Sequence, residues 1–157
     1  MRASALLLVL SAALGASGCT PGAPAAGAAN APMAATTTID VSLTSSSAVA
    51  TSFGTAGGFN PAVSTVAVGS TVRFLNVDSI SHTSSSFGGT AFPSSSPLGG
   101  SALSGFGGTL SGGWSSGTLA GGTASQVLLA DRAGTFLYGC FFHYDASPPM
   151  RGAIVVR

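Results

Sequence analysis

The sequence predicts an all-β domain, built as a Greek-key sandwich or barrel. Three observations lead to this: short runs rich in β-branched and aromatic residues, turn residues between those runs, and no apolar helical period sustained beyond a turn or two. Regularly spaced short strands with glycine-rich turns are typical of such folds. The 157 residues include 23 glycines, and only 6% are charged, which suits a turn-rich β domain.

The first expected strands begin soon after residue 35. Residues 39–44 alternate apolar and polar side chains, as a half-buried strand does. Residues 63–68 and 71–76 are β-branched runs on either side of Gly69-Ser70. This arrangement predicts a hairpin with a two-residue turn.

The last expected strands lie near the C-terminus. Residues 126–130 and 135–138 flank a turn at residues 131–134, and residues 153–156 form a short β-branched final strand.

A long Gly/Ser-rich stretch separates the two groups of strands, over residues 87–113. We expect a large loop, and loops of this length are either functional or mobile. A few apolar side chains within it are expected to contact the core: Phe92, Leu98, Leu103 and Phe106.

Residues 1–18 predict a lipoprotein signal peptide. Arg2 precedes an apolar run that is shorter than the roughly 20 residues needed to span a bilayer. Small residues then lead to Cys19, and this resembles a bacterial lipobox, in which the cysteine is acylated and becomes the mature N-terminus. Ordinary signal cleavage, with Cys19 left as a free or discarded thiol, is the alternative.

We therefore expect an exported protein, anchored by its lipid to a bacterial membrane and facing the periplasm or the cell exterior. Residues 19–35 are rich in Ala, Pro and Gly and predict a flexible linker. Residues 36–157 form the predicted β domain.

The charged residues exclude several classes of function. The chain has five Arg, no Lys, four Asp and no Glu, with a formal net charge of +1. No basic patch is available for phosphates, so we expect no nucleic-acid partner. The absence of Glu and the scatter of the Asp residues also argue against a paired-carboxylate active site.

The residues suited to chemistry gather in two segments. Cys140, His143 and Met150 follow the strand at 135–138, and His82 follows the strand at 71–76. Two imidazoles, a thiolate and a thioether form a soft ligand set, and a His₂Cys arrangement with a weak axial Met is the blue-copper geometry. Zinc would gain little from the thioether.

Each of these residues also has a purely structural interpretation. His82 suits a surface loop, Cys140 a buried thiol and Met150 a core position. However, both histidines of the chain and its only cysteine beyond the lipobox fall in this one pattern. That coincidence favours a metal site.

The pattern Tyr138-x-Cys140-x-x-His143, followed by Met150-x-Gly152, resembles the cupredoxin family of plastocyanin and halocyanin type. The resemblance covers most of residues 36–157 and implies a cupredoxin-type sandwich with one type 1 copper per chain. Carried over, it makes His82, Cys140 and His143 the equatorial ligands and Met150 the axial one. Six residues separate His143 from Met150, where four is the commoner plastocyanin-like spacing.

The resemblance implies single-electron transfer and no enzymatic activity, because a copper enclosed by four protein ligands leaves no position for substrate. Electrons would pass through the exposed edge of His143. An apolar docking patch would surround it, formed by Phe141, Phe142, Pro148 and Pro149. We expect a monomer at a membrane surface, with a donor and an acceptor redox protein as partners.

Two other functions fit the same sequence: a copper-carrying or copper-buffering lipoprotein, and a metal-free β-sandwich interaction module. Asn76 and Asp78 either support the His82 loop or form ordinary turns. Tyr138 and Trp114 are expected in the core rather than as electron relays.

Overall fold

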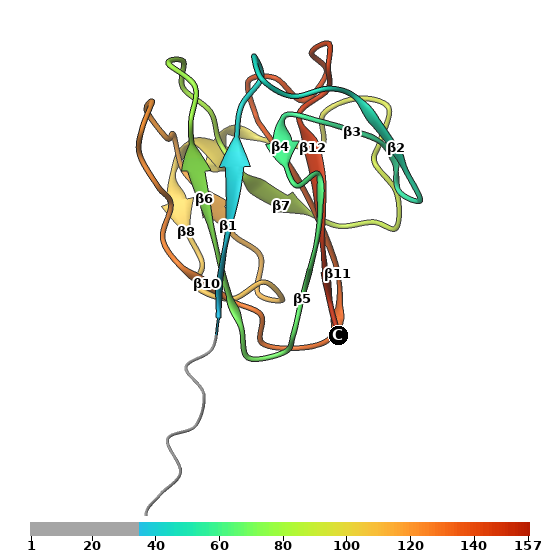
Figure 1. Ribbon diagram of the computed structural model, residues 1–157, viewed down its shortest axis with the longest axis vertical. Coiled ribbons are helices and arrows are strands. Elements are labelled where there is room, and N and C mark those ends of the chain that lie inside the picture. Colours follow the sequence, from blue (N-terminus) through green and yellow to red (C-terminus); the bar gives the residue numbers. More distant parts are fainter. Residues whose placement is uncertain (1–34) are drawn as a thin grey trace, which may run out of the picture. The chain divides into compact units, whose positions relative to one another are not determined.

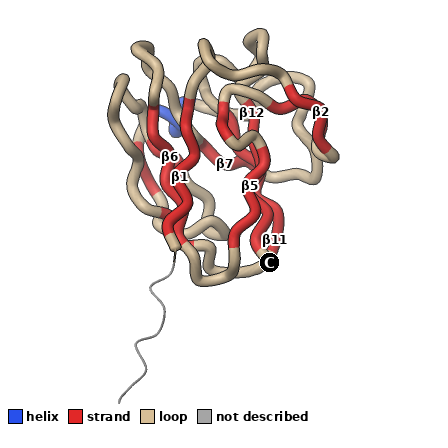
Figure 2. Tube along the Cα trace, viewed as in Figure 1, coloured by secondary structure: helices blue, strands red, loops and turns tan. Residues whose placement is uncertain are grey.

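The computed structural model describes residues 35–157 (Figure 1). The predicted signal peptide 1–18, Cys19 and the predicted linker as far as residue 34 lie outside this range. Within it, the one helical segment is the 3-10 helix η1 (Gly100–Leu103), and all other regular elements are strands (Figure 2). No helix in the described part of the chain is long and apolar enough to cross a membrane.

The strands form two main sheets and a small hairpin. One sheet has the order β10-β6-β1-β4, the other has the order β5-β12-β11-β7-β9-β8, and β2 pairs with β3. The bounds are β1 Thr36–Val41, β2 Val49–Thr51, β3 Gly54–Ala56, β4 Phe59–Asn60, β5 Val63–Val66, β6 Thr71–Asn76, β7 Ser85–Phe87, β8 Gly105–Phe106, β9 Ser115–Ser116, β10 Leu128–Leu129, β11 Gly134–Gly139 and β12 Arg151–Val156. The predicted all-β sandwich of Greek-key kind is confirmed.

The two sheets enclose one apolar core. Alternate residues of β1 and β6 face it, and β11 and β12 supply the opposite wall, as the alternating pattern of a sheet with one wet face requires. At its centre, Tyr138 packs edge-on against Phe59 and Phe74, with ring centroids 4.7 and 5.0 Å apart. Trp114 stacks beside Phe74 and is fully buried, so the prediction that Trp114 and Tyr138 are core residues is confirmed.

Gly152 permits this packing on β12. A Cβ atom at this position would overlap the ring carbon and hydroxyl of Tyr138, so any larger residue would displace the ring. The glycine of the Met-x-Gly motif thus has a packing role.

The predicted hairpin does not form. The turn at Gly69-Ser70 is present, but β5 pairs in parallel with β12, while β6 pairs with β1 and β10 (Figure 1). The second turn likewise leads from β10 in one sheet to β11 in the other. Both turns carry the chain across the sandwich, because each flanking strand buries its apolar face from the opposite side of the core.

The Gly/Ser-rich stretch is more ordered than expected. It contains η1 and β8, and its fully buried anchors are Ala102 and Leu110. Phe92 and Leu98 are half-buried, whereas Leu103 and Phe106 are 41% and 47% exposed, so their predicted contact with the core is wrong. Serine hydroxyls attach the segment instead: Ser115 donates to the Ala102 carbonyl at 2.8 Å and pairs with Ser85 at 2.8 Å.

The turn before β11 contains a carboxylate whose hydrogen bonds can be tested by acid titration. The Ser111 hydroxyl and its backbone N–H donate to the Asp131 carboxylate and hold the pKa of this carboxyl below its ordinary value. Because the folded-state pKa is the lower one, this stabilisation is present at neutral pH and is lost as pH falls through the folded-state pKa. With Ser111→Ala, we expect the Asp131 pKa to rise and acid unfolding to begin at a higher pH.

Carboxyl ¹³C NMR titration and far-UV circular dichroism measure the two effects. Ser94→Ala, at an exposed serine, is the matched control and should change neither. An unchanged Asp131 pKa in the Ser111 variant would contradict the assignment of these hydrogen bonds.

Candidate metal centre

Three residues from two distant segments of the sequence meet at one end of the sandwich: His82, Cys140 and His143. The Sγ atom of Cys140 lies 3.8 Å from the Nδ1 atom of His82 and 3.6 Å from that of His143. The two Nδ1 atoms are 3.2 Å apart. Among the described residues, this is the one group of three or more His, Cys, Asp or Glu side chains arranged for a metal ion.

These separations fit a shared ion. Metal–nitrogen and metal–sulfur bonds of about 2.0 to 2.3 Å, opened by about 105 to 120°, place their ligand atoms about 3.2 to 3.8 Å apart. All three distances fall in that interval, and imidazole with thiolate is a donor set that copper and zinc both accept. The residues therefore fit a copper ion.

His82 is held in place by hydrogen bonds in the loop that follows β6. β6 ends at Asn76, whose side-chain amide donates to the carbonyls of Ile80 and Leu119 at 2.7 and 2.9 Å and so closes the intervening loop. His82 also forms two backbone hydrogen bonds with Leu119. The imidazole is fully buried.

Cys140 and His143 belong to the loop between β11 and β12, which its own backbone closes. The N–H of Cys140 donates to the Met150 carbonyl, and the N–H groups of His143 and Met150 donate to the carbonyls of Cys140 and His143. The long spacing therefore still returns Met150, fully buried, to the two ligand residues. Gly58, with φ of +70°, lies against Met150, and a Cβ there would overlap its side chain.

Thr83 joins the two segments. Its backbone N–H points at the Cys140 sulfur at 3.4 Å, and its hydroxyl accepts a hydrogen bond of 2.8 Å from the Phe141 N–H. We did not predict this role, and a threonine after a histidine gives no signal of a partner 58 positions further along.

The surroundings of Cys140 favour its thiolate form. Burial alone would raise the pKa of this thiol, but the adjacent His82 imidazole and hydrogen bonds from backbone N–H groups, that of Thr83 among them, outweigh burial and lower it. At His143, burial and the neighbouring His82 lower the pKa, so this imidazole stays neutral near pH 7. A thiolate and a neutral imidazole are the forms that bind metals.

A buried carboxylate adjoins His82. Burial would raise the pKa of Asp78, yet hydrogen bonds from Thr44, His82, Ser42 and the Leu43 N–H hold it well below its usual range. The group is therefore ionised, and the pKa of His82 is raised because Cys140 and Asp78 outweigh its burial.

The ligand loop is held from outside by a part of the Gly/Ser-rich stretch. The Arg151 guanidinium lies 4.2 Å from the Tyr144 ring centroid and donates to the carbonyls of Pro93 and Tyr144 at 3.1 and 3.0 Å. It also pairs with Asp145, which in turn accepts from the Ser96 N–H. We call this set the Arg151 clamp; we did not predict it, because its contacts to Pro93 and Ser96 link segments 49 to 58 residues apart.

The surface near the site is partly apolar. His82 is fully buried but His143 is partly exposed, so His143 is the ligand imidazole that reaches solvent. Beside it Phe142 is 45% exposed, whereas Phe141, Pro148 and Pro149 are half-buried.

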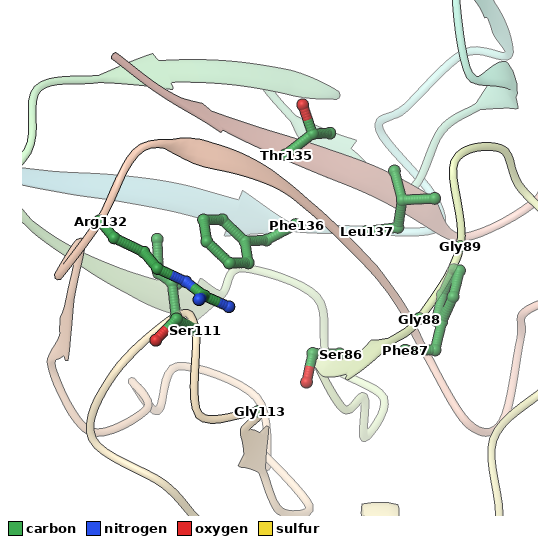
Figure 3. A pocket seen from close by; sticks show the side chains of 11 residues that line it. Ser86, Phe87, Gly88, Gly89, Ser111, Gly113, Arg132, Thr135, Phe136 and Leu137 are labelled. Carbon is green, nitrogen blue, oxygen red and sulfur yellow. The ribbon is translucent and has the colours of Figure 1, made fainter.

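A separate pocket of about 400 Å³ lies between β7, β11 and the turn at residues 111–113 (Figure 3). Arg132, Phe136 and Ser111 line it, and none of the clustered ligands does. The pocket is thus distinct from the metal centre.

No family model and no curated protein matches the chain. Solved structures with similar folds include a purple cupredoxin from Nitrosopumilus maritimus, at 20% identity and a TM-score of 0.46, covering 77% of this chain and 99% of that one. A mutant amicyanin in its reduced state has 21% identity and a TM-score of 0.46, covering 78% and 82%. A copper-containing nitrite reductase from Thermus scotoductus has 20% identity and a TM-score of 0.41, covering 63% and 20%. These identities and TM-scores are too low to assign a function to this chain. A functional proposal must therefore rest on the chain's own side chains.

The Arg151 clamp predicts unequal effects of two substitutions. Arg151→Gln loses the ring contact and charged hydrogen bonds of a side chain only 13% exposed, so we expect a loss of about 2 kcal/mol in the free energy of unfolding. Asp145→Asn removes an ion pair from a side chain that is 52% exposed, and should cost less than about 1 kcal/mol. Denaturant unfolding measures both; equal costs would assign the stabilisation to the ion pair instead.

Proposed function

We propose that this chain is a type 1 copper protein that transfers single electrons. The convergence of the Cys140 sulfur and the Nδ1 atoms of His82 and His143 within 3.8 Å carries the proposal. Met150 would complete the set as axial ligand, since the backbone returns it to Cys140 and His143. A bound copper would supply a one-electron couple between Cu(II) and Cu(I).

The residues of the chain then have separate tasks. Cys140 supplies a thiolate, and Thr83 donates its N–H to the sulfur and fixes its position. His82 remains shielded from water, while the partly exposed His143 provides the path to a partner. Phe142 offers apolar surface beside this edge, where a donor and an acceptor protein would dock.

Electron transfer is favoured over catalysis for two reasons. Four protein ligands would enclose the ion and leave no position for a substrate. Both histidines of the chain are used in this one cluster, so a second histidine-rich copper site cannot be built from the same chain.

Titration with Cu(II), followed by visible absorption, tests the proposal. We expect an intense thiolate-to-copper charge-transfer band at one copper per chain, and its loss in Cys140→Ser. Cys19→Ser changes the only other cysteine and should retain the band. A protein that stays colourless and binds no copper would leave the metal-free interaction module as the better interpretation.

Redox cycling in the presence of a chelator separates electron transfer from copper delivery. An electron carrier should bleach on reduction, keep its copper and regain the band on oxidation. A copper-carrying protein would release Cu(I) to the chelator, and such release would contradict the proposal.

The proposal extends to the location: export, with acylation of Cys19 anchoring the protein to a bacterial membrane. The small residues before Cys19 support it. Expressed in a bacterial host, the protein should partition with membranes and into detergent, whereas Cys19→Ser should be recovered in the aqueous phase. Aqueous recovery of both would contradict lipid anchoring.

A further inference from the structure

A buried carboxylate, Asp78, lies directly behind the candidate metal centre. It is 6% exposed and sits in the loop between β6 and His82. One carboxylate oxygen accepts from the Ser42 hydroxyl at 2.8 Å and from the Thr44 hydroxyl. The other accepts from the Leu43 N–H at 2.6 Å and the Thr44 N–H at 3.4 Å, and lies 2.9 Å from the Nε2 atom of His82.

These contacts are not those of an ordinary turn. The local turn in this loop belongs to Asn76, whose side-chain oxygen accepts from the Asp78 N–H at 2.9 Å. The Asp78 carboxylate instead reaches residues 34 to 36 positions earlier, just after the end of β1, and His82 ahead of it. The segment that follows β1 thus holds the carboxylate so that it faces the imidazole.

The arrangement dictates the tautomer of His82. An ionised carboxylate only accepts hydrogen bonds, so the Nε2 atom facing it must carry the proton. In the neutral imidazole, Nδ1 then keeps its lone pair, and Nδ1 is the atom that faces Cys140 and His143. A carboxylate behind a ligating histidine is a recurrent arrangement at metal centres, where it orients the ring and increases its basicity.

The charge of Asp78 is also unusual. Among the described residues, its only ionic partner is His82, and no Arg pairs with it. A buried charge without a cationic partner is costly unless hydrogen bonds or a metal compensate it. Hydrogen bonds from Ser42, Leu43 and Thr44 supply part of that compensation, and a metal ion on the far side of the imidazole would add to it.

We propose that Asp78 is a positioning residue of the metal centre, which fixes His82 as its Nε2–H tautomer and stabilises the more highly charged Cu(II) state. This inference rests on the proposed copper function. The fixed tautomer keeps Nδ1 free for metal. The negative charge interacts more strongly with Cu(II) than with Cu(I), so it lowers the reduction potential.

The first test uses the full protein without metal. Two-dimensional ¹H–¹⁵N NMR of the imidazole, at alkaline pH where the ring is neutral, reports which nitrogen of His82 is protonated. We expect the Nε2–H tautomer in the native protein. The Nδ1–H tautomer there would overturn the proposal, whether or not the protein binds copper and whatever the variants do.

The second test compares Asp78→Asn with Asp40→Asn. Both changes remove one negative charge, but the Asp40 side chain forms no hydrogen bond in the described structure and lies next to β4, facing away from the core. In Asp78→Asn we expect mixed His82 tautomers and Zn(II) affinity weakened about 10- to 100-fold. Asp40→Asn should match the native protein in both.

The copper-loaded protein gives the third readout. Loss of Cu(II) affinity relative to Cu(I) raises the reduction potential, by about 59 mV for each tenfold loss in a one-electron couple. We expect a higher potential in Asp78→Asn than in Asp40→Asn. Equal Zn(II) affinities and equal potentials in the two variants would overturn the role of Asp78, while a native protein that binds Zn(II) but gives no copper charge-transfer band would overturn only the proposed function.

Discussion

Thr83 joins the two segments that carry the clustered ligands, and the spacing of the ligand atoms depends on this junction. The residue follows His82 in the first segment, and through its N–H and its hydroxyl it contacts Cys140 and Phe141 of the second. Because both contacts come from one residue, the sulfur and the first imidazole cannot separate without breaking them. Asn76 and the Arg151 clamp stabilise the loops on either side of this junction.

The composition of the site could be predicted from sequence because the chain offers so few choices. With two histidines and one cysteine besides Cys19, the chain offers few candidate ligands, and their pattern resembles that of the cupredoxin family; the structure brings His82, Cys140 and His143 together. The all-β class followed from strand patterns of period two. Both kinds of signal are local in the sequence.

The errors have a common physical origin. A Gly-Ser turn between two β-branched runs is compatible with a hairpin and with a crossing between sheets, and only the position of the core decides which forms. The exposure of Leu103 and Phe106, the Arg151 clamp and the contacts of Asp78 likewise depend on segments far apart in the sequence. The position of Asp78, four residues before His82, is visible in the sequence. The direction of its carboxylate is not, because contacts with Ser42, Leu43 and Thr44 after β1 set it.

The parallel pairing of β1 with β6 has a practical consequence for handling the protein. Thr36 pairs with Thr71, whereas Val41 pairs with Asn76, at the end that leads to the ligands. The six residues of β1 extend about 20 Å, so the chain enters the domain at the opposite end from the ligands. The C-terminal strand finishes there too, since Val156 pairs with Gly134 at the start of β11 (Figure 1). An affinity tag, a fusion partner or an electrode linker joined directly before β1 or after β12 would therefore leave the ligand face open to solution.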